Sequence, residues 1–193
     1  PKIVAVSKNF SFEQIKPIIE YGHRDFGENK VQEAIEKWPD IKKSNSDLKL
    51  HMIGKLQTNK VKYVIPLFDY IHSLDNLKLA KKISSEQKKM NKDLKIFIQI
   101  NIGNEKQKSG IDIENLREFY KICSNELSLN IVGLMCIPPS EKDATPYFNK
   151  MMELKNSFGF RELSMGMSAD YLEAIKYGAS FIRIGSKIFG NRI

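Results

Sequence analysis

The chain has 193 residues, a length typical of one domain with a hydrophobic core of its own. Its 41% hydrophobic and 28% charged residues are close to globular averages, which excludes intrinsic disorder and collagen or coiled-coil architecture. No apolar run approaches the roughly 18 residues of a membrane span, and no signal peptide pattern opens the chain. We therefore expect a globular protein with no membrane partner.

The net charge of +8 is compatible with nucleic-acid binding, but the pattern of the charges does not favour it. The lysines are scattered, with the densest pairs at 81–82 and 88–89, and aromatic residues are not interleaved with them. We interpret the charge as a lysine-rich surface that favours a small anionic ligand, and we expect no nucleic-acid partner.

Few side chains suit metal or redox chemistry. Cys123 and Cys136 form no CxxC motif, and two thiols in a chain of this size predict a reducing, cytoplasmic environment. His23, His51 and His72 lie far apart and show no metal-ligand spacing, so we expect no metal site.

Short β-rich runs recur along the chain, with helical segments between them. The first helical segment shows the pattern clearly, because Phe12, Ile15 and Ile19 recur at three- and four-residue spacing. Ser11 and Gln14 form a capping-box pattern before it. The expected strands are residues 3–6, 25–27, 50–53, 70–72, 95–101, 131–137, 162–165 and 181–185.

Eight strands that alternate with helices predict a parallel α/β fold, and eight is the number that closes a TIM barrel. The alternative is an open doubly wound sheet, but no GxGxxG motif follows the first strand. We predict a single (β/α)8 barrel domain over residues 1–193, with its functional residues at the carboxyl ends of the strands.

Lys8 follows the first expected strand. Val4, Val6 and Lys8 share one strand face, so Lys8 is expected in the barrel mouth if the valines fill the interior. An amine partly removed from water there is able to condense with an aldehyde. The alternative is an ordinary lysine at a strand end.

The last two loops have the composition of an anion site. Residues 164–168 (Ser-Met-Gly-Met-Ser) lead into one expected helix, and Gly185-Ser186 leads into a terminal turn. Glycine lets the backbone approach an anion, and N–H groups at a helix start point toward it. TIM barrels often bind phosphate at these two loops. The alternative is two ordinary capped helix starts.

Arg183 is expected to point into the barrel. It alternates with Ile182 and Ile184, which would pack against the outer helices. A buried arginine needs an acceptor, which is either a ligand or a protein group such as an inward carboxylate.

Further short motifs are spread along the whole chain. They are Ala5-Val6-Ser7-Lys8, Phe26-Gly27-Glu28-Asn29 with Val31-Gln32-Glu33, His51-Met52-Ile53-Gly54 with Leu56-Gln57 and Asn59-Lys60, His72-Ser73, Lys108-Ser109-Gly110, Gly133-Leu134-Met135, Ser164-Met165-Gly166-Met167-Ser168, and Arg183-Ile184-Gly185-Ser186 with Phe189-Gly190. Together they resemble the pyridoxal 5′-phosphate (PLP) homeostasis protein family. The resemblance implies a barrel like the N-terminal domain of alanine racemase (PLP fold type III), without the second β domain.

The resemblance implies a role for each matching residue around the cofactor ring. Lys8 is the residue expected to form the Schiff base with PLP. Arg183 is expected to face the pyridine nitrogen, and Asn29 and His51 are expected in the pocket near the ring.

The resemblance also implies a phosphate site. Ser168, Gly185 and Ser186 are the expected cradle, with backbone help from Met167. Two departures from the family pattern stand out. Residues 41–49 are rich in lysine and serine and carry no family signal, and the helix that usually precedes the first strand is absent, so the N-terminal segment of the family is expected to be either truncated or not included in this sequence.

The expected function is to carry or buffer PLP, without efficient catalysis and therefore without catalytic residues. Arginine stays charged, so it disfavours protonation of the ring nitrogen and weakens the ring as an electron sink. Racemisation needs a second acid/base group, which in alanine racemases is a tyrosine that comes with the β domain. A PLP-dependent amino-acid racemase is the alternative, and a nucleic-acid-binding barrel is a third. We expect a cytoplasmic monomer whose partners are PLP and apo PLP-dependent enzymes.

Overall fold

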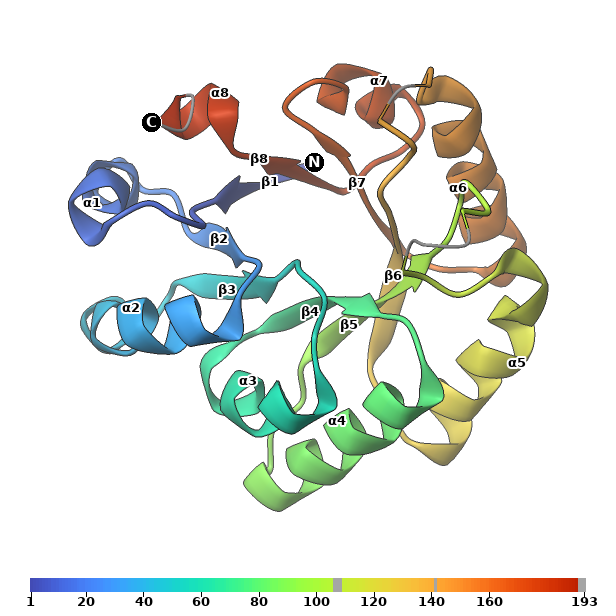
Figure 1. Ribbon diagram of the computed structural model, residues 1–193, viewed down its shortest axis with the longest axis horizontal. Helices are drawn as coiled ribbons and strands as arrows, with labels where there is room; N and C mark the ends of the chain where they lie inside the picture. The colour runs from blue at the N-terminus through green and yellow to red at the C-terminus, as the bar shows by residue number, and fades with distance from the viewer. Residues whose placement is uncertain (106–108, 141, 191–193) are drawn as a thin grey trace.

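Eight parallel strands close into a barrel in chain order, as the computed structural model of residues 1–105, 109–140 and 142–190 shows. This confirms the predicted (β/α)8 barrel and excludes the open doubly wound sheet. Figure 1 looks into the ring of strands, with the helices outside it. The strands are β1 (Lys2–Val6), β2 (Asp25–Glu28), β3 (Lys49–Met52), β4 (Tyr70–Leu74), β5 (Lys95–Ile100), β6 (Ile131–Cys136), β7 (Glu162–Met167) and β8 (Phe181–Ile184).

One α-helix follows each strand. The helices are α1 (Phe12–Glu20), α2 (Val31–Ser44), α3 (Val61–Leu67), α4 (Leu77–Met90), α5 (Leu116–Lys121), α6 (Thr145–Phe158), α7 (Tyr171–Lys176) and α8 (Ser186–Phe189). Short 3-10 turns at Thr58–Lys60 and Ile113–Asn115 precede α3 and α5, and a π-helical turn at Ile122–Glu126 follows α5. None of the described helices has the length and hydropathy that crossing a bilayer requires.

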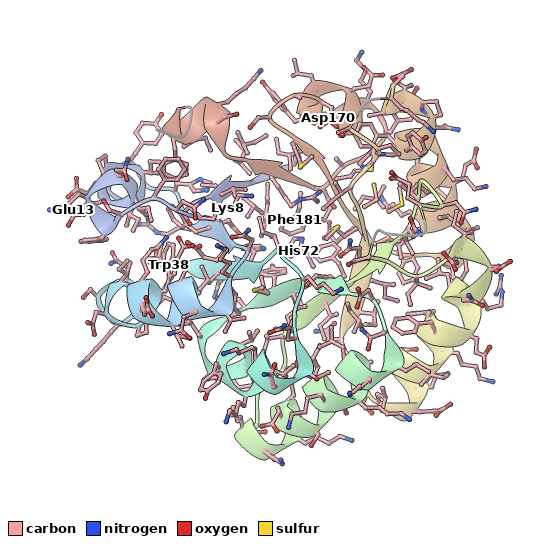
Figure 2. All side chains as sticks on the ribbon, in the orientation of Figure 1. Lys8, Glu13, Trp38, His72, Asp170 and Phe181 are labelled. Carbon is pink, nitrogen blue, oxygen red and sulfur yellow. The ribbon has the colours of Figure 1, made fainter. Side chains whose placement is uncertain are left out.

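The hydrophobic residues form two cores, one inside the barrel and one between the strands and the helices. The strand alternation behaves as expected, because Val4 and Arg183 face inward while Ala5, Ile182 and Ile184 pack toward the helices. The apolar cluster inside the barrel consists of Val4, Tyr70, Phe97, Val132, Met135 and Phe181. Figure 2 shows His72 and Phe181 near the centre of the ring, with Glu13 on its outer side.

Several strands run further toward the mouth of the barrel than expected. Glu28 belongs to β2 and pairs with Met52, and Met167 belongs to β7 and pairs with Arg183. Ser73 likewise lies within β4. The prediction treated these residues as loops because Gly, Ser and Glu have weak β propensity, but pairing with a neighbouring strand overrides that weak preference.

The start of α1 agrees with the capping-box pattern, and α4 also begins at a polar cap. Before α1, the backbone N–H of Ser11 donates to Gln14 Oε1 over 3.0 Å, as a capping box requires. At α4, Asn76 caps the helix by accepting from the backbone N–H of Leu79 over 2.9 Å. The motif Lys108-Ser109-Gly110 lies partly outside the described residues, which do not include Lys108.

Gly166 provides a test of the close packing between β7 and α7. Its φ is +90°, and an added Cβ would lie 2.6 Å from Ala174 Cβ, whereas Gly159 has φ of +71° and open space around it. Gly159→Ala should therefore lower the free energy of unfolding by about 1 kcal/mol through backbone strain alone. Gly166→Ala should cost roughly 1–3 kcal/mol more because of the clash. Urea denaturation of both variants checks this, and equal losses would contradict it.

Candidate functional site

A cavity of about 680 Å³ opens at the carboxyl ends of the strands, a volume in the range of small-molecule sites. Seven of the eight residues predicted for the site line it, and His51 does not. The lining residues are Val6, Lys8, Phe10, Asn29, Ile53, Gly54, Ile137, Met167, Ser168, Ala169, Arg183, Gly185, Ser186 and Gly190.

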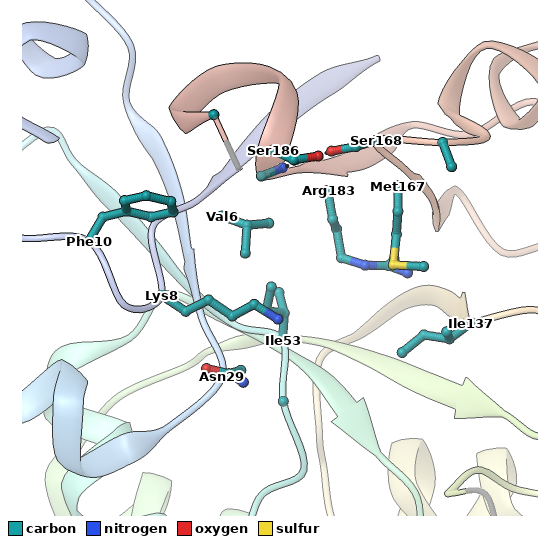
Figure 3. A pocket seen from close by; sticks show the side chains of 14 residues that line it. Val6, Lys8, Phe10, Asn29, Ile53, Ile137, Met167, Ser168, Arg183 and Ser186 are labelled. Atoms are coloured by element: carbon teal, nitrogen blue, oxygen red, sulfur yellow. Dashed lines mark hydrogen bonds between the residues drawn. The ribbon is translucent and has the colours of Figure 1, made fainter. Parts of the chain in front are cut away.

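Closure of the barrel brings the two ends of the chain together at this cavity. Strand β1 pairs with β8, with Val4 opposite Arg183 and Ala5 opposite Ile184. The residues that follow β1 therefore lie beside those that follow β8. In Figure 3, the Lys8 side chain extends into the cavity, with Asn29 on one side and Arg183 on the other.

A buried polar network holds the backbone just before Lys8. Glu28 Oε1 accepts from Ser7 Oγ over 2.8 Å, from Trp38 Nε1 over 2.9 Å and from Lys37 Nζ over 3.0 Å. Lys37 Nζ also donates to the backbone oxygen of Ser7 over 2.9 Å. Burial raises the pKa of Glu28, although Lys37 and the hydrogen bonds of Trp38 and Ser7 act to lower it.

Sequence reasoning missed this network. Ser7 and Glu28 stand in the family motifs, but nothing in those motifs connects them to Lys37 and Trp38. The four side chains come from the end of β1, from β2 and from α2, so only the tertiary structure brings them together. A buried glutamate beside a buried tryptophan N–H is the signal that a structure reveals and a sequence does not.

The loops after β7 and β8 are joined across the cavity wall. The backbone N–H of Gly185 donates to Ser168 Oγ over 3.2 Å, and the backbone N–H of Met167 donates to Asp170 Oδ1 over 2.6 Å. Ser168, Gly185 and Ser186 thus lie together, as the anion-site prediction requires. The Met167 N–H, which was expected to assist, has a partner within the protein.

Arg183 points into the barrel and lines the cavity with only 4% of its surface exposed. Its Nη1 donates to Ser164 Oγ over 2.7 Å, and its Nη2 donates to the backbone oxygen of Cys136 over 2.8 Å. These two acceptors are neutral, and within the described ranges no carboxylate contacts the guanidinium directly, so the expected alternative of an inward carboxylate partner does not hold there. A guanidinium has five N–H donors, which leaves others for a ligand.

Asn29 has a buried acceptor atom at the cavity wall. Its Oδ1 has no hydrogen-bond partner among the residues that the structure describes, and the residue lines the cavity. An unsatisfied buried acceptor costs about 1–3 kcal/mol, so such an atom at a cavity wall suits a ligand that donates to it. Gly54 supports this position from behind, because a Cβ there would lie 2.2 Å from the backbone oxygen of Asn29.

The placement of His51 corrects the prediction that it lies in the pocket near the ring. The side chain is fully buried in the barrel interior, stacked on Tyr70 at 4.2 Å. Its Nε2 lies 3.0 Å from Asp25 Oδ1, and its Nδ1 lies 2.9 Å from His72 Nε2. A polar side chain that points inward from β3 is buried in the barrel and needs hydrogen-bond partners there. The cavity wall near β3 is formed instead by residues 53 and 54, which follow the strand.

The family matched by the sequence is described as alanine racemase, N-terminal domain, over residues 1–192. The pyridoxal phosphate homeostasis protein of Aquifex aeolicus is 38% identical over 99% of this chain and 87% of that protein. The chain belongs to the pyridoxal phosphate homeostasis protein family. The protein of that name from Escherichia coli is 35% identical over 98% of this chain and 85% of its own length.

Solved structures with the same fold support this family assignment. PipY of Synechococcus elongatus without PLP has a TM-score of 0.90 and 35% identity, and covers 98% of this chain and 92% of its own. The same protein with PLP bound has a TM-score of 0.88 at 34% identity over the same shares. Alanine racemase of Clostridium difficile, at 16% identity and a TM-score of 0.76, shares the fold, and this chain spans 52% of it. The described residues form the barrel and contain no second domain.

The two interior histidines predict an acid-sensitive fold. Burial lowers the pKa of His51, and burial together with the charges of His51 and Arg183 places the pKa of His72 well below its usual value. The folded protein therefore favours neutral imidazoles, whereas the unfolded chain binds protons near pH 6.5. The contribution of these neutral histidines to the free energy of unfolding is therefore fully present above about pH 6.5. As the pH falls below that value, each histidine loses about 1.4 kcal/mol of this contribution per pH unit.

His72→Gln should reduce this pH dependence. We expect the free energy of unfolding of the variant to fall less steeply between pH 6.5 and 5 than that of the wild type, by up to about 1.4 kcal/mol per unit. His23→Gln is the control, because His23 is only partly buried and lies before β2, outside the barrel interior. Denaturant titrations across this pH range measure the slopes. An unchanged slope in His72→Gln would contradict the assignment.

Proposed function

We propose that this protein binds PLP through Lys8 in the cavity at the barrel mouth and holds it for cellular PLP homeostasis. One observation carries the proposal: the amine-bearing side chain of Lys8 extends into the same cavity that the glycine- and serine-containing loops after β7 and β8 line. The names of the relatives and the PLP-bound PipY structure support it. The volume of the cavity and the unpartnered Asn29 Oδ1 fit a phosphorylated ring that carries a hydroxyl group.

PLP supplies an aldehyde when it is bound, and the chain supplies the groups that hold it. Lys8 Nζ is the amine that condenses with the aldehyde carbon, with the carbonyl oxygen leaving as water. Arg183 donates toward the pyridine nitrogen, and Asn29 accepts from the ring hydroxyl. Ser168, Gly185 and Ser186 receive the phosphate, with Met167 beside them.

A carrier fits this cavity better than a racemase does. Racemisation requires an acid/base group on the face of the substrate opposite the lysine. The lining residues include no carboxylate, histidine, cysteine or tyrosine, as far as the described part of the chain extends. Lys8 and Arg183 are the ionisable side chains of the lining, and an arginine is a poor proton donor at neutral pH. We therefore assign no catalytic residue.

The proposal extends to the compartment, the oligomeric state and the partners of the protein. We propose that it acts as a cytoplasmic monomer and passes PLP to apo PLP-dependent enzymes. Cys123 and Cys136 are each buried as a free cysteine, which supports a reducing compartment. The reversible nature of the amine–aldehyde condensation supports release of the cofactor to other proteins.

Covalent trapping tests the role of Lys8. Borohydride reduction of the PLP-loaded protein should add one reduced pyridoxyl phosphate group to Lys8, detected by peptide mass spectrometry. Lys8→Ala should lose both this adduct and the visible absorbance of the loaded protein. Lys30→Ala is the matched control, because Lys30 is exposed and is not part of the cavity wall. Labelling of Lys8→Ala at the wild-type level would rule out this site.

A transfer assay separates a carrier from a racemase. The loaded wild-type protein should restore activity to an apo PLP-dependent enzyme, and it should leave the optical rotation of a single amino-acid enantiomer unchanged. Lys8→Ala, carried through the same loading and desalting, should restore no activity. Measurable racemisation by the loaded wild type would overturn the carrier assignment.

A further inference from the structure

A continuous chain of hydrogen bonds crosses the barrel interior and ends at the cavity. Asp25 Oδ1 lies 3.0 Å from His51 Nε2, and His51 Nδ1 lies 2.9 Å from His72 Nε2. His72 Nδ1 lies 2.7 Å from Ser164 Oγ, which accepts from Arg183 Nη1 over 2.7 Å. The five residues belong to β2, β3, β4, β7 and β8, so the barrel itself assembles the chain.

The two ends of the chain determine the direction of every bond in it. A guanidinium can only donate and an ionised carboxylate can only accept. His51 Nε2 must therefore donate to Asp25, which leaves the Nδ1 of a neutral His51 as an acceptor. His72 Nε2 then donates to His51, and Ser164 Oγ donates its proton to His72 Nδ1. Each link carries one proton, and both histidines are neutral and protonated at Nε2.

Stacking holds both imidazoles in the planes that this arrangement needs. His51 stacks on Tyr70 with 4.2 Å between ring centroids and 8° between planes. His72 stacks on Phe97 with 4.4 Å and 25°. The neighbouring rings leave little freedom for either imidazole to flip, so the hydrogen-bonding atoms of His51 and His72 stay aligned.

Burial favours the neutral forms of both histidines, although the carboxylates near His51 partly oppose it. Both rings are fully buried, which penalises an imidazolium. Asp25 and Asp69 act to raise the pKa of His51 and Lys2 acts to lower it, but burial is the largest effect and the pKa is lowered. Arg183 and any charge on His51 act together with burial to lower the pKa of His72. A proton on His72 would therefore face a like charge at the guanidinium.

We propose that Asp25, His51, His72 and Ser164 are positioning residues that orient the cavity-facing guanidinium of Arg183 through one unidirectional hydrogen-bonded chain. The inference rests on the proposed function, because it concerns how Arg183 is presented to the pyridine nitrogen of PLP. The chain gives the buried charge of Arg183 a link to a carboxylate on the other side of the barrel. A carboxylate in direct contact with Arg183 would instead place a negative charge beside the ring nitrogen and favour its protonation.

Histidine nitrogen NMR of the cofactor-free protein tests the direction of the chain without any ligand. With 15N-labelled histidine, His51 and His72 should each give the pattern of a neutral ring protonated at Nε2 at pH 7. Signals are assigned by comparison with His51→Gln and His72→Gln. A ring protonated at Nδ1, or an imidazolium, at either position would overturn the proposal.

Ser164→Ala tests the consequence for the cofactor, and Ser73→Ala is its control. Ser73 is also a buried strand serine, but its Oγ has no hydrogen-bond partner in the described part of the chain. With PLP labelled by 15N at the ring nitrogen, Ser164→Ala should move the ring signal toward that of PLP bound without an arginine donor, as in Arg183→Ala. We also expect an affinity loss of about tenfold for Ser164→Ala.

Ser73→Ala should leave the ring signal and the affinity as in the wild type. Thermal unfolding of both variants establishes that each is folded at the temperature of measurement. An unmoved ring signal in folded Ser164→Ala would show that the chain does not position Arg183. Absence of PLP binding by the wild type would instead defeat the proposed function, and the histidine spectra would still decide the direction of the chain.

Discussion

Pairing between the first and last strands is the constraint on which the site depends. The register of β1 on β8 sets Val4 beside Arg183 and brings the loop with Lys8 next to Gly185. A ligand with a reactive carbonyl at one end and an anion at the other can be held only if those two loops are neighbours. An open sheet with β1 and β8 at opposite edges would separate them, so closure of the barrel and assembly of the site are one event.

The interior of the barrel serves two opposing requirements. Apolar side chains such as Phe97 and Phe181 fill it for stability, while Arg183 brings a charge that burial disfavours. The protein resolves the conflict by giving the guanidinium neutral acceptors and leaving the carboxylate of Asp25 at the partly exposed end of the chain, where 18% of that side chain is accessible. Among the described residues, positive charge thus reaches the cavity without a carboxylate in direct contact, although Asp170 acts on the guanidinium electrostatically.

Two buried polar systems flank the cavity from different sides. The Glu28–Lys37–Trp38 network fixes the backbone at Ser7, immediately before Lys8. The histidine chain fixes Arg183 from below the cavity floor. Both bury polar groups whose hydrogen bonds offset the cost of burial, although Glu28 Oε2 has no partner among the described residues. Both also tie a residue of the cavity to other strands or to a helix. The cavity is therefore held by polar contacts as well as by hydrophobic packing.

The sequence by itself determined the eight strands, the inward face of Arg183 and the grouping of Lys8 with the residues after β7 and β8, because alternation and strand order depend on local periodicity. The tertiary structure decided the features that depend on contacts between residues far apart in the sequence. Glu28 and Met167 belong to strands because their neighbours pair with them. His51 lies in the interior because Asp25 and His72, from other strands, complete its hydrogen bonds. The spacing of residues along the chain does not predict such contacts, because they form only when segments distant in the sequence come together.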